Sequence, residues 1–219
     1  QDGPKSKKPA YAPMIHAASG YDMTLLQYQE KQEKPAVTGV FVADILGGLY
    51  STSAIQTALF QRERSGIGQQ IDTTLMECML NLLIYEIQFE QQPSPARRPR
   101  YGPLPALDGF IIVVPINANN FKNLCHVVGH PEWMEDPLFL TPGDRVRNWD
   151  ELMARVGLWT AERTALECET ILLDGGVPAS RYLGVGEAMQ DPQAIHSGSF
   201  VDVEDTAGKF RVVNPPYKM

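Results

Sequence analysis

A proline-rich segment from Gln92 to Ala106 divides this chain into two parts. The segment holds five prolines and three arginines. Proline lacks a main-chain N–H and fixes its own backbone angle, so this composition can hold neither a helix nor a central strand. We therefore predict a linker over 92–106 between an N-terminal region, 1–91, and a C-terminal region, 107–219. Its cluster Arg97-Arg98-Pro99-Arg100 is interpreted as solvated, with contact to a phosphate or an acidic partner as the alternative.

The N-terminal region has the apolar spacing of helices. After a polar stretch, apolar residues recur at intervals typical of helix faces, and Gly66-Ile67-Gly68 predicts a turn between two of them. The elements predicted here are helices over 14–29, 43–64 and 74–91 and a short strand over 70–73. We interpret this region as the end of an α/β domain.

The C-terminal region mixes both kinds of element. Asp108-Gly109 predicts a turn before a strand, and Thr206-Ala207-Gly208 predicts the turn of a hairpin. The predicted elements are strands over 110–116 and 178–183, helices over 119–128, 147–160 and 164–173, and hairpin strands over 201–205 and 209–213. This pattern is typical of a small α+β domain.

One acidic residue, Asp44, lies at the start of the helix predicted over 43–64. It is followed by Gly47 and Gly48, which permit close approach of backbone or ligand and weaken a helix by roughly 1 kcal/mol each relative to alanine. Small residues beside a carboxylate suggest room for a ligand, which makes Asp44 the best catalytic candidate. Helix capping is the alternative, because an N-cap aspartate accepts hydrogen bonds from free N–H groups and complements the helix dipole.

Composition narrows the classes of function. The net charge of −7 and a pI near 5.1 argue against nucleic acid as a partner, because phosphate binding needs clustered positive charge. An apolar content of 43% is enough to bury a core. The sequence has no apolar run of about 18 residues and no basic start followed by an apolar stretch, which predicts no membrane association and a cytoplasmic location.

Cysteine and histidine spacing gives no sign of a metal site. The three cysteines are far apart and lie in apolar helical patterns, which predicts buried free thiols: Cys78, Cys125 and Cys168. His126 and His130 are four residues apart, but Gly129-His130-Pro131 is expected to end that helix. We therefore expect no metal.

A series of short motifs runs along nearly the whole chain. In the N-terminal region these are Asp2-Gly3-Pro4, Pro9-Ala10-Tyr11, Ala18-Ser19-Gly20, Thr38-Gly39, Ala43-Asp44, Gly47-Gly48, Arg62-Glu63-Arg64-Ser65-Gly66 and Ile71-Asp72. In the C-terminal region they are Pro105-Ala106-Leu107-Asp108-Gly109, Asp136-Pro137-Leu138-Phe139, Gly176-Val177-Pro178-Ala179 and Asp191-Pro192-Gln193. In this order they resemble the family III CoA-transferases, the CaiB/BaiF group. An ordered string of this kind is far more specific than any single motif.

The resemblance implies a mechanism and a set of site residues. In that family the aspartate at the Asp44 position attacks an acyl-CoA thioester, forming a mixed anhydride and then an aspartyl-CoA thioester before the second acid is loaded. A carboxylate suits this role because it is both nucleophile and leaving group. The implied substrates are coenzyme A, as acyl-CoA, and a carboxylic acid. Contacts to coenzyme A are expected from Tyr11, Lys8, Gly47 and Gly48.

The resemblance also implies a partial chain. Relatives begin with a Rossmann-like half that supplies most of the CoA-binding surface, and this sequence starts after it and lacks the C-terminal return segment. The expected fold is thus the end of a Rossmann-like large domain, mostly helical here, joined by the linker to a small α+β domain. Relatives form interlocked dimers, so a homodimer is expected.

Two other functions stay open. A chain without the nucleotide-binding half could act as a non-catalytic binding or oligomerisation module, using apolar surface that would otherwise pack on the missing domain. An acyl-CoA racemase or isomerase is less favoured, because racemases of the superfamily resemble Gly-His-Asp where this chain has Ala10-Tyr11-Ala12. Racemisation at an α-carbon needs a second proton carrier, and the histidine of that motif is absent here.

Overall fold

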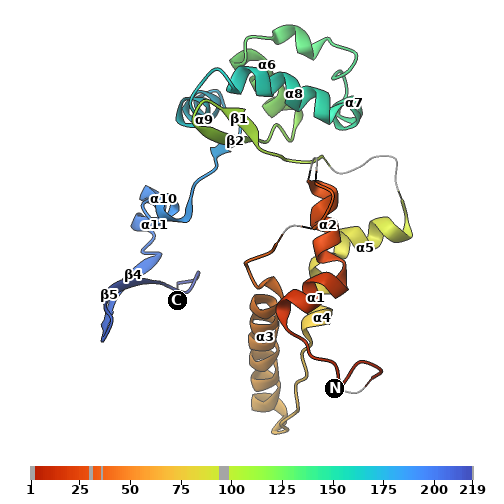
Figure 1. Ribbon diagram of the computed structural model, residues 1–219, viewed down its shortest axis with the longest axis vertical. Helices are drawn as coiled ribbons and strands as arrows, with labels where there is room; N and C mark the ends of the chain where they lie inside the picture. The colour runs from red at the N-terminus through yellow and green to blue at the C-terminus, as the bar shows by residue number, and fades with distance from the viewer. Residues whose placement is uncertain (1–2, 30–31, 36, 94–98, 219) are drawn as a thin grey trace. The chain divides into compact units, whose positions relative to one another are not determined.

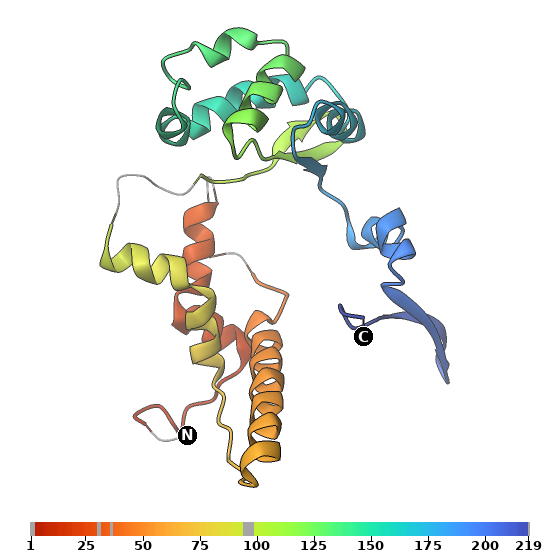
Figure 2. The ribbon, with the colours of Figure 1, turned by 180° about the vertical axis from the view of Figure 1, so that it is seen from behind.

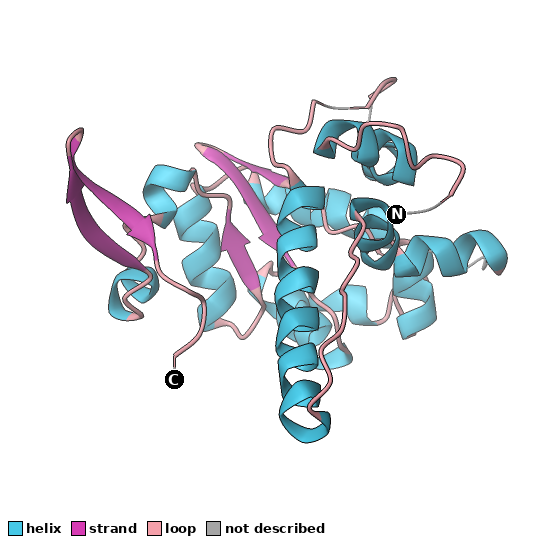
Figure 3. Cartoon of the chain, turned by 90° about the horizontal axis from the view of Figure 1, so that it is seen from below, coloured by secondary structure: helices cyan, strands magenta, loops and turns pink. Residues whose placement is uncertain are grey.

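The computed structural model describes residues 3–29, 32–35, 37–93 and 99–218. The chain divides into two compact units, Gln1–Pro95 and Ala96–Met219, called here the N-terminal unit and the C-terminal unit. Helices and small antiparallel sheets together make the protein mixed α/β, as the sequence predicts (Figure 1). All strands of the described residues belong to the C-terminal unit, where Figure 3 draws them in magenta.

The described part of the N-terminal unit is helical. Its elements are α1 Ala12–Ser19, α2 Tyr21–Tyr28, α3 Val42–Ser65, α4 Leu75–Leu82 and α5 Ile84–Gln91. Helices α1, α3 and α4 lie side by side (Figures 1 and 2). They enclose a small apolar core made of Ala12, Ile15, Ala43 and Met79. This core places the start of α3 against α1.

Two predicted helices are each broken into two. The helix predicted over 14–29 is interrupted at Gly20, whose φ of 89° is a left-handed conformation that glycine adopts without steric cost. The helix predicted over 74–91 is interrupted at Leu83, where φ is −92° and ψ is 25°. The Leu83 N–H still donates to the Met79 carbonyl at 3.2 Å, so the chain bends there while keeping its hydrogen bonds.

The segment between α3 and α4 contains no strand, so the strand predicted over 70–73 is wrong. Residues 70–73 have no ladder partner among the described residues, and an isolated extended segment gains no sheet hydrogen bonds. The helix predicted over 43–64 is confirmed as α3. It ends at Gly66, which has a φ of 70° and donates its N–H to the Arg62 carbonyl at 2.8 Å, a left-handed helix end.

A three-stranded antiparallel sheet begins the C-terminal unit. Its strands are β1 Leu104–Ala106, β2 Gly109–Val113 and β3 Ala179–Arg181, in that order across the sheet. Ile111 at the centre of β2 pairs with Leu104 on one side and Arg181 on the other. The first strand corrects the prediction that 92–106 is linker throughout. Pro105 is tolerated there because β1 is an edge strand.

Helices also form a large part of the described residues of this unit. They are α6 Ala118–Val127, a 3-10 turn η1 Pro131–Met134, α7 Pro142–Arg147, α8 Trp149–Thr160, α9 Ala165–Asp174, α10 Val185–Ala188 and α11 Pro192–His196, before a hairpin of β4 Phe200–Asp205 and β5 Gly208–Val213. The predicted helices over 119–128, 147–160 and 164–173 are confirmed as α6, α8 and α9. The short α7 was not predicted, and it contains Arg147.

The core of the C-terminal unit lies between the sheet and the helices α6, α8 and α9. Fully buried side chains from α6, the loop before α7, α8 and α9 meet there, including Leu124, Phe139, Leu152 and Leu172. The three cysteines of the chain are buried and free, as predicted. Burial raises the pKa of the Cys125 thiol to about 11, so this thiol ionises only at strongly alkaline pH.

The segment just before β1 is attached to α8. Nε1 of Trp149 donates to the carbonyl of Arg100 at 2.8 Å, and the ring of Tyr101 meets Trp149 edge-on. The guanidinium of Arg100 pairs with the Asp150 carboxylate at 2.9 Å. Of the arginine cluster predicted to be solvated, Arg97 and Arg98 lie outside the described residues.

The β4–β5 hairpin is confirmed and has two different faces. Val203 lies opposite Phe210 on one face. On the other face Arg211 donates to the Asp202 carboxylate, with 3.2 Å between nitrogen and oxygen. One face of the hairpin is therefore apolar and the other carries paired charges.

Candidate functional site

Asp44 lies in the first turn of α3 but does not cap it. The N-cap residue is Phe41, which has no side chain able to accept a hydrogen bond from the helix. Asp44 is the third residue of the helix, and none of the hydrogen bonds among the described residues involves its carboxylate. The capping alternative for Asp44 is therefore wrong. Its carboxylate is exposed to solvent at the end of the helix where the dipole favours a negative charge.

Among the first four residues of α3, only Asp44 has a free main-chain N–H in the described structure. At the start of α3 the N–H of Val42 donates to the Val40 carbonyl at 3.0 Å, and that of Ile45 donates to the Phe41 carbonyl at 3.2 Å. Within the described part of the chain the N–H of Asp44 has no acceptor. An exposed carboxylate and an unpaired N–H thus belong to the same residue, in a helix end that attracts negative charge.

A buried histidine that the sequence did not single out supports this turn. His16 lies in the last turn of α1 with 1% of its surface exposed. Its Nε2 accepts the main-chain N–H of Ala43 at 3.1 Å, and its ring lies 5.2 Å from that of Tyr21 between centroids. The spacing of Ala12, Ile15 and His16 on α1 is the signal that could have placed this histidine on the buried face.

The two glycines after Asp44 have different surroundings. Gly47 is buried, and a β-carbon placed on it would lie 2.7 Å from Cδ2 of Leu75 on α4. Gly48 is exposed, and a β-carbon there would meet nothing within 4 Å. Gly47 therefore permits close packing of α3 on α4, whereas Gly48 leaves open space beside Asp44.

Tyr11 and Lys8 precede α1. Tyr11 is its N-cap residue, and 72% of its surface is exposed. Its carbonyl accepts the N–H groups of Met14 and Ile15, so the backbone holds the helix start while the ring stays free. Lys8 is exposed in the preceding turn, where its N–H donates to the Lys5 carbonyl at 2.9 Å. Contact of either side chain with coenzyme A stays a prediction.

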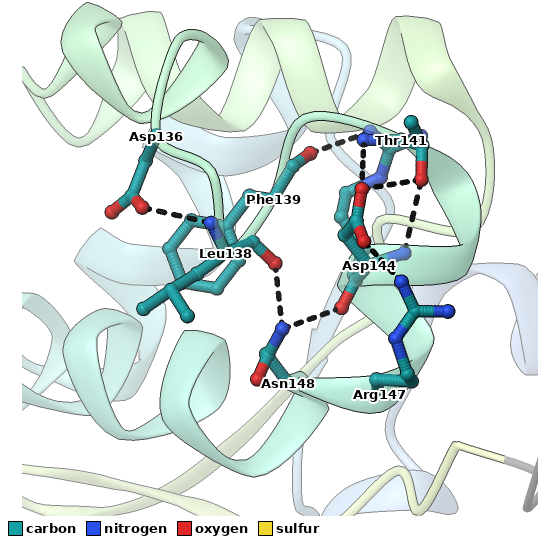
Figure 4. Close-up of polar contacts among 8 residues, drawn as sticks. Asp136, Leu138, Phe139, Thr141, Asp144, Arg147 and Asn148 are labelled. Atoms are coloured by element: carbon teal, nitrogen blue, oxygen red, sulfur yellow. Dashed lines mark hydrogen bonds and ion pairs between the residues drawn. The ribbon is translucent and has the colours of Figure 1, made fainter.

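A second set of polar residues, around α7, has structural partners throughout (Figure 4). Thr141 and Asp144 form a reciprocal capping box at the start of α7. Hydrogen bonds from Thr141 lower the pKa of Asp144, and the N–H of Leu138, followed by Arg155, lowers that of Asp136. These carboxylates are held as acceptors in the fold, which argues for a structural role rather than a catalytic one.

Two further classes of site have no counterpart in the described residues. No group of three or more histidine, cysteine, aspartate or glutamate side chains is gathered there in a way that could hold a metal ion. None of the described helices combines the length and the apolar character needed to cross a membrane.

Comparison with known proteins agrees with the motifs. The model of CoA-transferase family III matches residues 1–219. The chain is 31% identical over 221 residues to succinate–glutarate CoA-transferase of Agrobacterium fabrum, covering 95% of this chain and 54% of that protein. It is 26% identical over 217 residues to formyl-CoA:oxalate CoA-transferase of Bradyrhizobium diazoefficiens, covering 84% of this chain and 51% of that protein. The chain spans about half the length of these curated relatives.

Solved structures share the fold. A CaiB/BaiF family protein from Brucella suis superposes with a TM-score of 0.78 at 30% identity, covering 100% of this chain and 58% of that one. The orthorhombic crystal structure of Rv3272 from Mycobacterium tuberculosis gives a TM-score of 0.87 at 21% identity, covering 100% of this chain and 60% of that one. The family model matches the whole chain, in agreement with the ordered motifs. The protein therefore belongs to CoA-transferase family III.

Proposed function

We propose that this chain carries the acyl-accepting carboxylate of a CoA-transferase, and that Asp44 is that carboxylate. The observation that supports this is its position: exposed, without a side-chain partner among the described residues, in the first turn of a long helix. A structural aspartate at a helix start is normally engaged as a cap. Asp44 is free of that role.

The proposed reaction moves coenzyme A from an acyl-CoA thioester to a carboxylic acid. The Asp44 carboxylate attacks the thioester carbonyl and expels the CoA thiolate, which leaves a mixed anhydride. The thiolate then attacks the aspartyl carbonyl and releases the first acid, which leaves an aspartyl-CoA thioester. The acceptor carboxylate attacks that thioester and expels the CoA thiolate, which leaves a second mixed anhydride. The thiolate then attacks the acyl carbon of the acceptor, which forms the new acyl-CoA and restores the Asp44 carboxylate. Each step replaces one acyl bond by another, as in covalent catalysis generally.

Neighbouring groups suit the charges that develop. The free main-chain N–H at the start of α3 can donate to an oxyanion, because an unpaired donor at a helix start stabilises negative charge. The open space beside Gly48 leaves room for the thioester. The exposed ring of Tyr11 and the ammonium of Lys8 are assigned to the acyl-CoA, with Lys8 directed to a phosphate.

A non-catalytic binding or oligomerisation module is the second candidate. The observation that favours it is apolar exposure along α3, where Leu49 is 63% exposed and Phe60 is 60% exposed. Contiguous exposed apolar side chains mark surfaces that associate with other chains. A homodimer fits either function.

Intact-mass spectrometry separates the two candidates. The purified chain is incubated briefly with formyl-, acetyl-, succinyl- or glutaryl-CoA, with hydroxylamine as a trap. Transfer predicts an adduct that maps to Asp44 and is absent from Asp44→Asn. The matched control is Glu63→Gln, which removes an exposed carboxylate near the other end of α3 and is expected to leave the adduct unchanged. An unmodified mass with every thioester contradicts transfer and favours the module.

A further inference from the structure

His16 is a polar group in an apolar place. Among the described residues only His16 and Thr160 are polar and buried. His16 lies beside the core cluster that includes Ile15 and Met79. Burying an imidazole away from water costs free energy unless a hydrogen bond compensates. The compensating bond is the one from the N–H of Ala43, the residue immediately before Asp44.

The direction of that bond determines the chemical state of the ring. A main-chain N–H can only donate, so Nε2 of His16 must offer its lone pair, and the proton of the neutral ring resides on Nδ1. The bond satisfies a donor that the helix itself cannot satisfy, because the first N–H groups of a helix have no partner within it. Phe41 provides no cap. His16 therefore supplies from α1 the acceptor that the N-cap residue of α3 lacks.

We propose that His16 is a positioning residue for Asp44, an assignment that rests on the proposed function. Nε2 of the imidazole lies 3.1 Å from the main-chain nitrogen of Ala43, the second residue of α3. This hydrogen bond holds the backbone from which the Asp44 carboxylate extends. With the N–H of Ala43 engaged, the adjacent N–H of Asp44 is the donor left for an oxyanion. The side chain does not touch substrate and acts through the main chain alone.

Two amide substitutions distinguish this role from simple filling of the core. The carbonyl oxygen of glutamine lies the same number of bonds from Cβ as Nε2 of histidine, whereas that of asparagine lies only as far out as Nδ1. His16→Gln therefore keeps an acceptor oxygen within reach of the N–H of Ala43. His16→Asn has the same amide group, but its oxygen is one bond closer to Cβ and does not reach that N–H. His126→Asn, at an exposed histidine of the C-terminal unit, is the matched control.

The experiment combines two measurements on each variant of the whole 219-residue chain, after circular dichroism has shown a cooperative unfolding transition. One is hydrogen exchange at the amide of Ala43, and the other is the rate of adduct formation at Asp44. We expect His16→Asn to speed the exchange and to slow labelling by about tenfold to a hundredfold, the scale of a misplaced catalytic group. His16→Gln and His126→Asn are expected to stay near the wild-type values in both.

The outcomes are distinguishable. A folded His16→Asn chain that labels Asp44 at the wild-type rate overturns the assignment. If His16→Asn does not fold, His16→Gln decides: slow labelling in a folded His16→Gln chain overturns the assignment, and wild-type labelling supports it. If none of the thioesters forms an adduct with the wild-type chain, the proposed function itself is overturned. This result is reached before any His16 variant is compared.

Discussion

Gly47 of α3 faces Leu75 of α4 so closely that a β-carbon on Gly47 would lie 2.7 Å from Cδ2 of Leu75. Leu75 can rotate away from a single methyl group, so valine is the sharper test. We expect Gly47→Val to destabilise the protein by about 1–3 kcal/mol, the usual cost of overpacking. Urea unfolding followed by circular dichroism measures it. Gly48→Val, in open space, is the control, and equal losses from both would contradict tight packing at Gly47.

Trp149 offers a test of how the segment before β1 is held. Its Nε1 donates to the Arg100 carbonyl at 2.8 Å, and replacement by phenylalanine removes this donor while keeping an aromatic ring. We expect Trp149→Phe to lower the free energy of unfolding by about 1 kcal/mol for the lost hydrogen bond, with some further loss from the smaller ring. Faster protease cleavage near Arg100 should accompany it. Unchanged cleavage would mean that the bond does not hold the segment.

Acid should destabilise the protein through Asp144 and Asp136, whose pKa values are lowered in the folded chain. A lowered carboxyl pKa contributes stability that is complete above the unfolded pKa, about 3.9, and is lost as pH falls toward the folded value. We therefore expect the melting temperature to fall as the pH drops below about 4. Asp144→Asn should be less stable at pH 7 and should lose less on acidification. Parallel curves for variant and wild type would exclude Asp144 as a source of the effect.

The three buried thiols should make the folded protein less stable at high pH. Burial raises the pKa of Cys125 to about 11 and also raises those of Cys78 and Cys168. A thiol held protonated in the folded state stabilises less as pH rises, because the unfolded thiol ionises first, near pH 8.5. Stability should therefore decline above about pH 8.5. A thiol reagent at pH 8 should modify the native chain slowly and modify three cysteines after unfolding. Rapid modification of native Cys125 would contradict this.

Helices whose signals are local could be predicted from the sequence. The helix α9 has apolar spacing and a capping box between Thr164 and Glu167, so its bounds follow from residues within it. The bend at Leu83 has no such signal, since no glycine or proline marks it. Strand β1 exists because β2 pairs with it, and a proline-rich segment alone does not indicate such a partner.

The residues of the candidate site also differ in whether the sequence alone could predict their roles. Asp44 could be found from its small neighbours and the motif around it, because those signals are adjacent in sequence. The support from His16 could not, because it depends on α1 packing against the start of α3, 27 residues further along the chain. The distinction between Gly47 and Gly48 also depends on α4.

The two outer strands of the sheet, β1 and β3, are each only three residues long, and Pro105 in β1 has no N–H to offer a neighbouring strand. Long, regular sheet edges are templates on which other chains can add strands and aggregate. This sheet presents little of such a template on either side. Substitution of Pro105 would restore an N–H donor on the outer strand, so this proline keeps a further strand from pairing with β1 at that position.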